Sequence, residues 1–301
     1  MLIGVPIEVA LVLIGAIATF TLRLLFNDTL GPLLANKLSI SGQNKLDKFN
    51  ENAFNAIFYT LSLSIGALGL YRSGWLELPL VPNSTCMIPS VSDWTNDWSS
   101  AFTQLYYGIA TSYYLQAVFT SVTIDTQRKD KWVMFSHHII TLILIIGSAY
   151  IGRFRMGLLT LLAHDVSDIF LYTAKVLHYA KSPWDKSFFF LFAVSFIVLR
   201  LVLLPYYTYA CMKSYECTWQ VIYLDFGNGW VTDPPYVFGN GPKTITLFGL
   251  TFVKFGILIA FLLALIAMHA WWATIILKMA FGGSTQDDRS DDEEEEKEKP
   301  E

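Results

Sequence analysis

The chain has 301 residues, of which 53% are hydrophobic and only 15% charged, and its mean hydropathy is +0.44. These values exclude an ordinary soluble domain, and the length accommodates several membrane spans of about 20 apolar residues each. The formal net charge of −4 arises from an acidic C-terminal run, without which the chain is mildly basic. The sequence has no internal repeat and no Gly-rich phosphate-binding motif, and nothing in it supports binding to nucleic acid.

Seven apolar segments predict membrane-spanning helices. They cover residues 3–25, 52–71, 101–124, 132–150, 155–178, 187–211 and 245–279. The first segment has no basic stretch before it and no clear cleavage site, so we expect a retained span rather than a signal peptide. The sequence therefore predicts an all-α, polytopic membrane helix bundle with about seven transmembrane helices, within a range of six to eight.

Basic residues gather in alternate connecting loops. These loops hold Lys37, Lys45 and Lys48, then Arg128, Lys129 and Lys131, then Lys181 and Lys186. The other loops are poorer in basic residues or mix them with acids. Because basic loops stay in the cytosol, we expect a lumenal N-terminus and a cytosolic C-terminus.

The predicted lumenal loops hold candidate modification sites. Asn83-Ser84-Thr85 is an N-glycosylation sequon, which predicts a glycan on Asn83. Cys86 and Cys217 also fall in lumenal loops, where a disulfide between them is permitted. Cys211 is an alternative partner for Cys217, and three free thiols are a further alternative.

The C-terminal segment 282–301 is predicted to be a disordered cytosolic tail. From Asp287 it reads DDRSDDEEEEKEKPE, a run that cannot bury apolar surface. Ser290 is followed directly by acidic residues, beginning with Asp291, Asp292 and Glu293, a pattern that suits an acidophilic kinase. We therefore expect phosphorylation at Ser290, which would alter binding partners rather than folding.

The fourth and fifth segments form a hairpin that carries an unusual set of polar residues. His137 and His164 lie at nearly equal distances along the chain from the turn at Ile151. In an antiparallel helical hairpin they meet at one depth, about 20 Å from the turn and inside the membrane. His138, Asp165 and Asp168 accompany them. Intramembrane ionisable residues are costly, which favours a site inside the bundle.

Local spacing suggests how these side chains pair. Residues 137 and 138 diverge by about 100° on a helix, so one His is expected to face the partner helix and the other a neighbouring helix or cavity. Thr141, one turn beyond His137, is placed to hydrogen-bond it. A His–Asp pair between His164 and Asp168 would supply a general base.

Two other interpretations of the hairpin stay open. The polar groups could serve only as interhelical hydrogen bonds. A di-iron site is disfavoured because the chain has five histidines and His178 and His269 are expected to lie far from the cluster. A single Zn²⁺ held by His and Asp remains an alternative to a metal-free site.

The hairpin resembles the Lag motif of ceramide synthases, within the TRAM–Lag–CLN8 (TLC) family. The matching elements are Arg128-Lys129-Asp130, the His137-His138 pair, Arg155-x-Gly157, His164-Asp165 with Asp168, and Ala174-Lys175 before Tyr179. The similarity extends over roughly 45–280. It implies an N-terminal span and cytosolic loop (1–44), a TLC-type catalytic domain (45–281) and the acidic tail.

The resemblance implies acyl transfer from a fatty acyl-CoA to the amine of a sphingoid base in the endoplasmic reticulum membrane. We expect His137 or His138 to take the amine proton. His164, oriented by Asp165 or Asp168, would hold the leaving thiol or the oxyanion. A ping-pong route through an acyl-imidazole is the alternative. Neither route needs a metal or any cofactor besides acyl-CoA as co-substrate.

Further residues are expected to bind substrates. Arg128, Lys129 and Lys131 would pair the phosphates of CoA, unless they only set the orientation. Arg200, near the middle of its span, is expected to pair with Asp165 or Asp168, or with the thioester carbonyl. Gln116 would line the cavity or hydrogen-bond a neighbouring helix.

Two expectations concern partners and function class. Membrane lipids, a homo- or heterodimer and a small accessory subunit are the expected partners. The alternative function is a non-catalytic TLC-type protein that binds or senses lipids.

Overall fold

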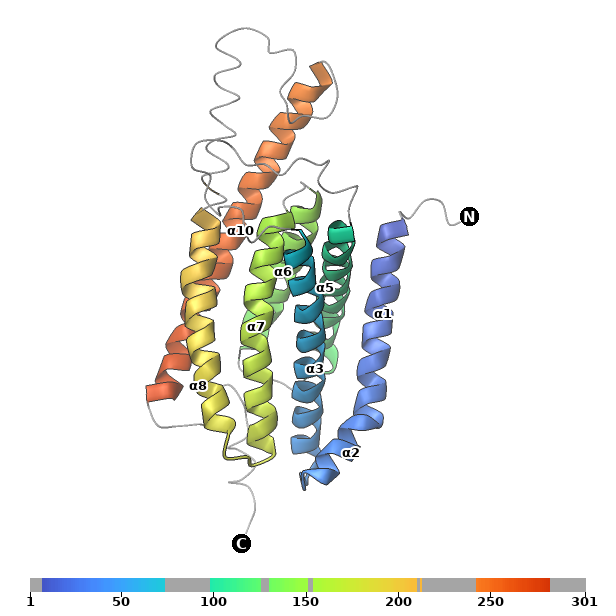
Figure 1. Cartoon of the computed structure of the whole chain (residues 1–301), viewed down its shortest axis with the longest axis vertical. Helices are drawn as coiled ribbons and strands as arrows, with labels where there is room; N and C mark the ends of the chain where they lie inside the picture. The colour runs from blue at the N-terminus through green and yellow to red at the C-terminus, as the bar shows by residue number, and fades with distance from the viewer. Residues whose placement is uncertain are drawn as a thin grey trace.

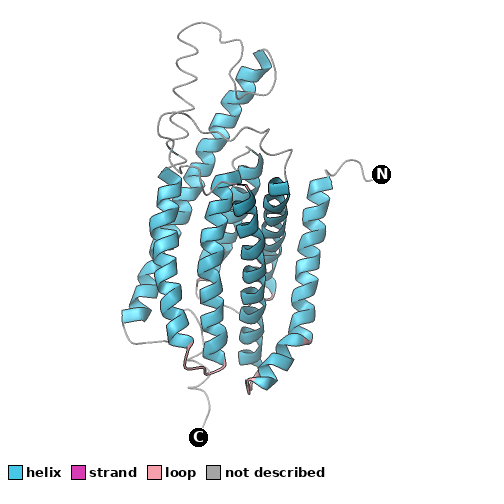
Figure 2. Cartoon of the chain, in the orientation of Figure 1, coloured by secondary structure: helices cyan, strands magenta, loops and turns pink. Residues whose placement is uncertain are grey.

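The computed structural model describes residues 7–73, 98–125, 130–150, 154–209, 212 and 242–281, and within these ranges every regular element is helical (Figures 1 and 2). The helices are α1 (Ile7–Asp28), α2 (Leu30–Lys37), α3 (Gln43–Arg72), α5 (Trp98–Thr123), α6 (Lys131–Tyr150), α7 (Phe154–Tyr179), α8 (Asp185–Phe196), the π-helix η1 (Ile197–Leu203) and α10 (Pro242–Phe281). The predicted all-α membrane bundle is confirmed.

Among the described residues, five helical stretches are long and apolar enough to cross a membrane. They are Ala10–Lys37, Gln43–Arg72, Lys131–Ala149, Asp185–Tyr209 and Gly256–Phe281. The other two expected spans form α5 and α7, which stand among these helices in the bundle (Figure 1). Both are less apolar because their polar side chains point into the protein. α5 packs against α1, α3 and α6, and α7 against α3 and α8.

Two helices are longer than their sequence patterns predicted. α3 begins at Gln43, directly after Gly42 at φ 96°, and so takes in Lys45 and Lys48, for which the sequence predicts a loop. Its 30 residues span about 45 Å, more than a hydrocarbon core of about 30 Å. The first part of α10 extends beyond the ends of its neighbours (Figure 1). Both helices therefore reach out of the membrane.

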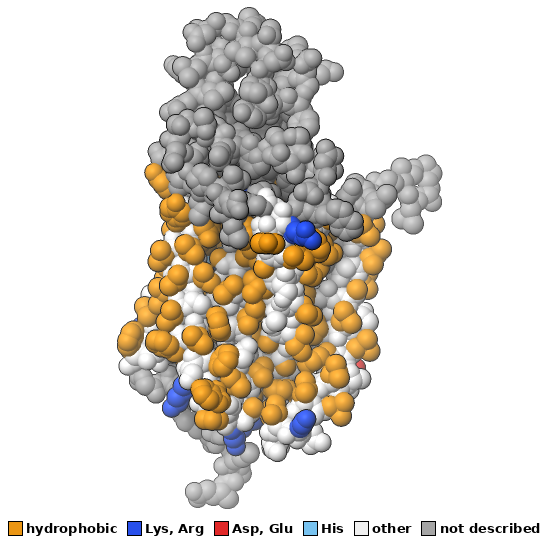
Figure 3. All heavy atoms as spheres, in the orientation of Figure 1, with side chains coloured by type: hydrophobic (Ala, Val, Ile, Leu, Met, Phe, Trp, Pro, Cys, Tyr) orange, Lys and Arg blue, Asp and Glu red, His pale blue; other side chains and the backbone are white. Residues whose placement is uncertain are grey.

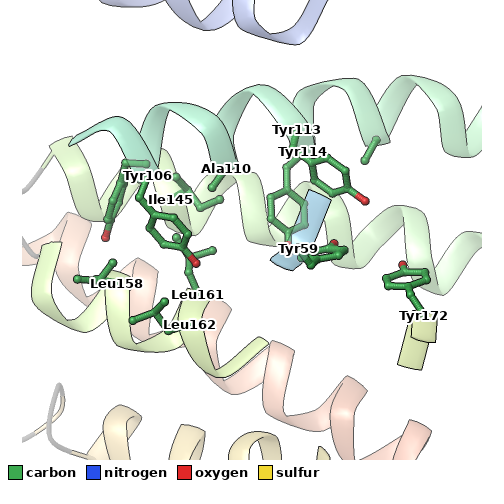
Figure 4. Packing of buried hydrophobic residues seen from close by; sticks show 12 residues of the cluster. Tyr59, Tyr106, Ala110, Tyr113, Tyr114, Ile145, Leu158, Leu161, Leu162 and Tyr172 are labelled. Carbon is green, nitrogen blue, oxygen red and sulfur yellow. The ribbon is translucent and has the colours of Figure 1, made fainter. Parts of the chain in front are cut away.

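The centre of the bundle is built from tyrosines rather than from aliphatic residues alone (Figure 4). Tyr59 and Tyr172 stack at 5.5 Å between ring centroids, and Tyr113 meets Tyr59 edge-on at 5.3 Å. Buried hydroxyls need partners. The hydroxyl of Tyr113 donates to Asn55 Oδ1 at 3.0 Å. This core joins α3, α5 and α7 by packing and hydrogen bonds together.

The adjoining ends of α6 and α7 are held to α5. Tyr107 Oη donates to the carbonyl of Phe154 at 3.0 Å and lies 3.2 Å from Ser148 Oγ. A side chain on Gly157 would collide with this hydroxyl, so the close approach requires glycine there. These contacts fix the register of α6 against α7, and with it the depth of their histidines.

The lateral surface of the bundle is apolar (Figure 3). Large hydrophobic side chains that are more than half exposed include Leu11, Ile17, Leu61, Phe190 and Val202. A soluble monomer rarely shows so continuous an apolar surface. Lys and Arg side chains on the face in view lie toward the two ends of the bundle. This distribution is that of a protein surrounded by lipid.

Candidate active site

Three histidines from three helices meet inside the bundle. The ring centroid of His137 on α6 lies 6.1 Å from that of His164 on α7, and His269 on α10 lies 5.7 Å and 4.9 Å from these two. All three are buried, and His269 is completely so, at 0% exposure. The predicted meeting of His137 and His164 at one depth is therefore confirmed. We call His137, His164 and His269 the three-histidine cluster.

Aromatic rings enclose the three-histidine cluster. Trp272 lies 5.4 Å from His137 and 5.9 Å from His269, and Phe196 meets His269 edge-on at 5.7 Å. Trp272 also donates its indole N–H to Asp130 Oδ2 at 3.2 Å, which ties α10 to the start of α6. Burial behind these rings lowers the local dielectric, which strengthens any polar interaction formed inside the cluster.

The hydrogen bonds of His164 determine what it offers to the cluster. Its Nδ1 lies 2.7 Å from the carbonyl of Thr160, and because a carbonyl only accepts, Nδ1 carries the proton. In the neutral ring Nε2 then presents a lone pair. Within the described ranges Nε2 of His164, Nδ1 of His137 and both ring nitrogens of His269 are buried without a hydrogen-bond partner. Such costly unmet groups are expected where a substrate binds.

His269 corrects the sequence-based prediction, which placed it far from the cluster. It lies on α10, a hundred or so residues beyond the hairpin, and no sequence spacing relates the two. One signal was present: an isolated histidine in a long apolar segment is costly and needs a reason. His178, also expected to lie far away, is indeed at the far end of α7 and pairs with Asp185 at 3.2 Å.

The side chain of His138 lies outside the three-histidine cluster, in a separate pocket, as the divergence of adjacent residues on a helix predicted. It lines a polar pocket of about 50 Å³ between α1, α3, α5, α6 and α7. The lining residues are Arg23, Glu51, Asn55, Tyr113, Gln116, Ala117, Thr120, Ser121, Asp125, Lys131, Met134, His138 and Tyr172. Gln116 and Lys131, both predicted to bind substrate, are thus part of this polar pocket. Because His137 and His138 are consecutive residues of α6, the three-histidine cluster and the polar pocket lie on adjoining faces of this helix.

Asp165 does not orient His164 as predicted. It accepts hydrogen bonds from Tyr106 Oη at 2.7 Å and Ser62 Oγ at 3.2 Å, on the side of α3 and α5. Adjacent residues on a helix diverge by about 100°, so Asp165 turns away from the cluster that its neighbour enters. Its role in the structure is to hold α7 against the tyrosine core.

Asp168 pairs with Arg200, one of the two carboxylates predicted for that arginine. The Arg200 guanidinium lies 2.5 Å from Asp168 Oδ1 and donates to Ser167 Oγ at 2.8 Å and to the His164 carbonyl at 3.1 Å. The prediction that Asp168 orients the His164 ring is wrong, because the carboxylate is engaged by Arg200 instead. Arg200 fixes the backbone of His164 and so positions the ring indirectly.

Arg200 sits in the π-helix η1. Pro205 follows and cannot donate to the carbonyl one turn back, and a wider π-turn before it accommodates this break. π-turns interrupt helices mostly at functional sites. Here the wider turn brings Arg200 toward α7, where it also lies over the Phe196 ring at 5.0 Å.

Other predicted residues are placed as follows. Thr141 is buried, and its hydroxyl has no partner among the described residues, so the expected bond to His137 is absent. Arg128, Lys129, Asn83, Cys86, Cys211, Cys217 and Ser290 lie outside the described residues. In the part of the chain that the structure describes, no three His, Cys, Asp or Glu side chains are arranged to hold a metal ion.

Comparison with known proteins adds an independent finding. Residues 48–278 match the family model of the TLC domain, TRAM_LAG1_CLN8. "ASC1-like protein 3" of Oryza sativa subsp. japonica is 35% identical over 167 residues, 55% of this chain and 56% of that protein. "Ceramide synthase 1 LOH3" of Arabidopsis thaliana is 32% identical over 198 residues, 65% of this chain and 62% of the relative.

A third similar protein extends the match. "Ceramide synthase LOH1" of Arabidopsis thaliana is 30% identical over 237 residues, which are 78% of this chain and 68% of that protein. The chain spans about half the length of the first of these relatives. All of the three-histidine cluster lies within the matched residues 48–278.

Proposed function

Since the chain belongs to the TLC-domain family, we propose that it is a ceramide synthase, which transfers a fatty acyl group from acyl-CoA to the amine of a sphingoid base. The observation that carries this proposal is the two-sided arrangement around α6. His137 enters a dry cluster with two further imidazoles, whereas the adjacent His138 lines a polar pocket. An acyl transfer between two amphipaths needs these two environments to meet at one point.

The reaction forms one C–N bond and breaks one C–S bond. The amine nitrogen attacks the acyl carbon, its proton passes to the imidazole of His138, and the thiolate of CoA leaves and is protonated. His164 presents a lone pair at Nε2, which suits it to accept a proton from His137 rather than to stabilise an oxyanion. His269 has two unpartnered ring nitrogens and lies against the rings of His137 and His164. It is therefore placed to donate a hydrogen bond to either of them or to the substrate between them.

The acyl-imidazole route begins at His137 instead. His137 attacks the thioester while His164 takes its proton, and CoA leaves as the thiol with that proton; the amine then displaces the imidazole, giving its own proton to His138 and restoring His137. Incubation with labelled acyl-CoA in the absence of sphingoid base separates the two routes. Only the acyl-imidazole route leaves label on the protein, and His137→Ala removes that label.

The test of the proposed function is acyl transfer by purified protein. A panel of acyl-CoAs is incubated with sphinganine, and amide product is measured for the wild type and for His138→Ala. We expect product from the wild type and none from the variant at matched folding. A well-folded wild type that forms no product, even with added membranes that could supply an accessory subunit, would favour the lipid-binding alternative.

His269 provides a prediction that the hairpin motif alone does not make. We expect His269→Ala to lower kcat about 100-fold with little change in either KM, because a group that acts on the developing charge is used in the transition state. His178→Ala is the matched control, since that ring is 57% exposed and pairs outside the cluster. Equal activities for the two variants would exclude a role for His269 in the chemistry.

The cellular setting completes the proposal. Apolar exposed side chains and several apolar spans make the chain a multi-pass membrane protein. We place it in the endoplasmic reticulum with a lumenal N-terminus and a cytosolic C-terminus. Arg128 and Lys129 would then lie on the side from which CoA arrives and would pair its phosphates, whereas Lys131 lines the polar pocket.

A further inference from the structure

The polar pocket holds groups that neither the three-histidine cluster nor the hairpin motif accounts for. Arg23 comes from α1, which precedes the matched domain, and it donates to Thr120 Oγ1 at 3.2 Å and pairs with Asp125 at 2.5 Å. Gln116 donates to the same Thr120 hydroxyl at 3.1 Å. This network joins α1 to α5 and closes one side of the polar pocket.

The polar pocket is also lined by a carboxylate and an amide from α3. Glu51 is only 6% exposed and Asn55 only 7%. They lie one turn apart, so both side chains project from one face of the helix. A carboxylate buried this deeply in the protein is costly unless polar or charged groups compensate it, and such a cost favours a binding role.

The chemistry of the lining suits a small amino alcohol. Glu51 and Asp125 balance Arg23 and Lys131, so the polar pocket has no net charge to attract polyanions such as the phosphates of CoA. Amide groups of Asn55 and Gln116 both donate and accept, as hydroxyl ligands require. His138 lines the same pocket as these residues, so an amine bound there would lie near its proton acceptor.

We infer that the polar pocket binds the 2-amino-1,3-diol head group of the sphingoid base. This assignment rests on the proposed function and deepens it by giving each substrate its own side of α6. Glu51 orients the amine toward His138, and Asn55 and Gln116 receive the hydroxyls. The acyl group occupies the three-histidine side. Glu51, Asn55 and Gln116 are therefore residues that select the acceptor.

Glu51→Gln tests the assignment. The variant keeps the size of the side chain and removes its charge, and we expect the KM for sphinganine to rise about tenfold while the KM for acyl-CoA is unchanged. Asp47→Asn, an equivalent change on an exposed residue one turn earlier in α3, is the control and should match the wild type. A KM for sphinganine that stays at the wild-type value, or an equal rise for acyl-CoA, would overturn the inference.

Substrate analogues give a test that needs no mutation of Glu51. Octadecylamine has the amine and the chain but no hydroxyls, so the wild type should use it about 100-fold less well than sphinganine. In Asn55→Ala this preference should shrink, because one partner of the hydroxyls is gone. Equal use of both amines by the wild type would contradict the inference.

Direct binding separates this inference from the proposed function. Labelled sphinganine is bound to the detergent-solubilised full chain without acyl-CoA, and the dissociation constants of wild type, Glu51→Gln and Asp47→Asn are compared. Weaker binding by Glu51→Gln alone supports the polar pocket even if no amide is formed. Identical binding by all three refutes it even if the enzyme is active.

Discussion

Replacement of His137 by alanine is expected to abolish amide formation, lowering kcat/KM by about 10³-fold or more. His137 contacts both other members of the three-histidine cluster and adjoins His138, whose ring centroid lies 5.8 Å away. In the proposed mechanism its loss would remove the nucleophile of the acyl-imidazole route and the ring that packs beside His138, the base of the direct route.

His178→Ala is again the control, with activity within about twofold of the wild type. Trp272 packs on the His137 ring, so the unfolding midpoint of each variant is measured beside its activity to separate chemistry from packing. A His137→Ala protein that is folded and keeps more than a tenth of the activity would exclude the acyl-imidazole route and leave the direct route with His138 as base.

How far these features could be predicted depends on the range of the interactions involved. The helices followed from hydropathy, and the meeting of His137 with His164 followed from the rise per residue in a tight hairpin. Both are local rules. Tyr107 holds the adjoining ends of α6 and α7, so the register that the rule assumes is the register that forms.

Longer-range partners could not be predicted in the same way. His269 reaches the cluster on a helix that no short turn connects to the hairpin, so the sequence contains no register for it. Asp165 and Asp168 were both reasonable partners for Arg200, and the choice depended on the rotation of α7. Tyr106 and Ser62 hold Asp165 on the other side. Which carboxylate pairs with Arg200 depends on how α3, α5, α7 and η1 pack together, and no local rule gives that packing.

The buried ion pair of Arg200 and Asp168 is expected to contribute strongly to the stability of the protein. Arg200→Met is expected to reduce the free energy of unfolding by about 3–5 kcal/mol, because it leaves a buried carboxylate without its partner. Three hydrogen bonds between η1 and α7 are lost with it, to Ser167, Asp168 and the His164 carbonyl. The fall in the thermal midpoint of the detergent-solubilised protein, followed by tryptophan fluorescence, measures the change.

A second substitution distinguishes an unpaired charge from lost packing. Adding Asp168→Leu to Arg200→Met removes the orphaned carboxylate, and we expect the double variant to recover at least half of the lost stability. Activity should not recover, because the His164 backbone has still lost the hydrogen bond that positions its ring. Recovery of both would mean that Arg200 serves only to neutralise Asp168. Recovery of neither would mean that the cost lies in the packing of Arg200 against Phe196.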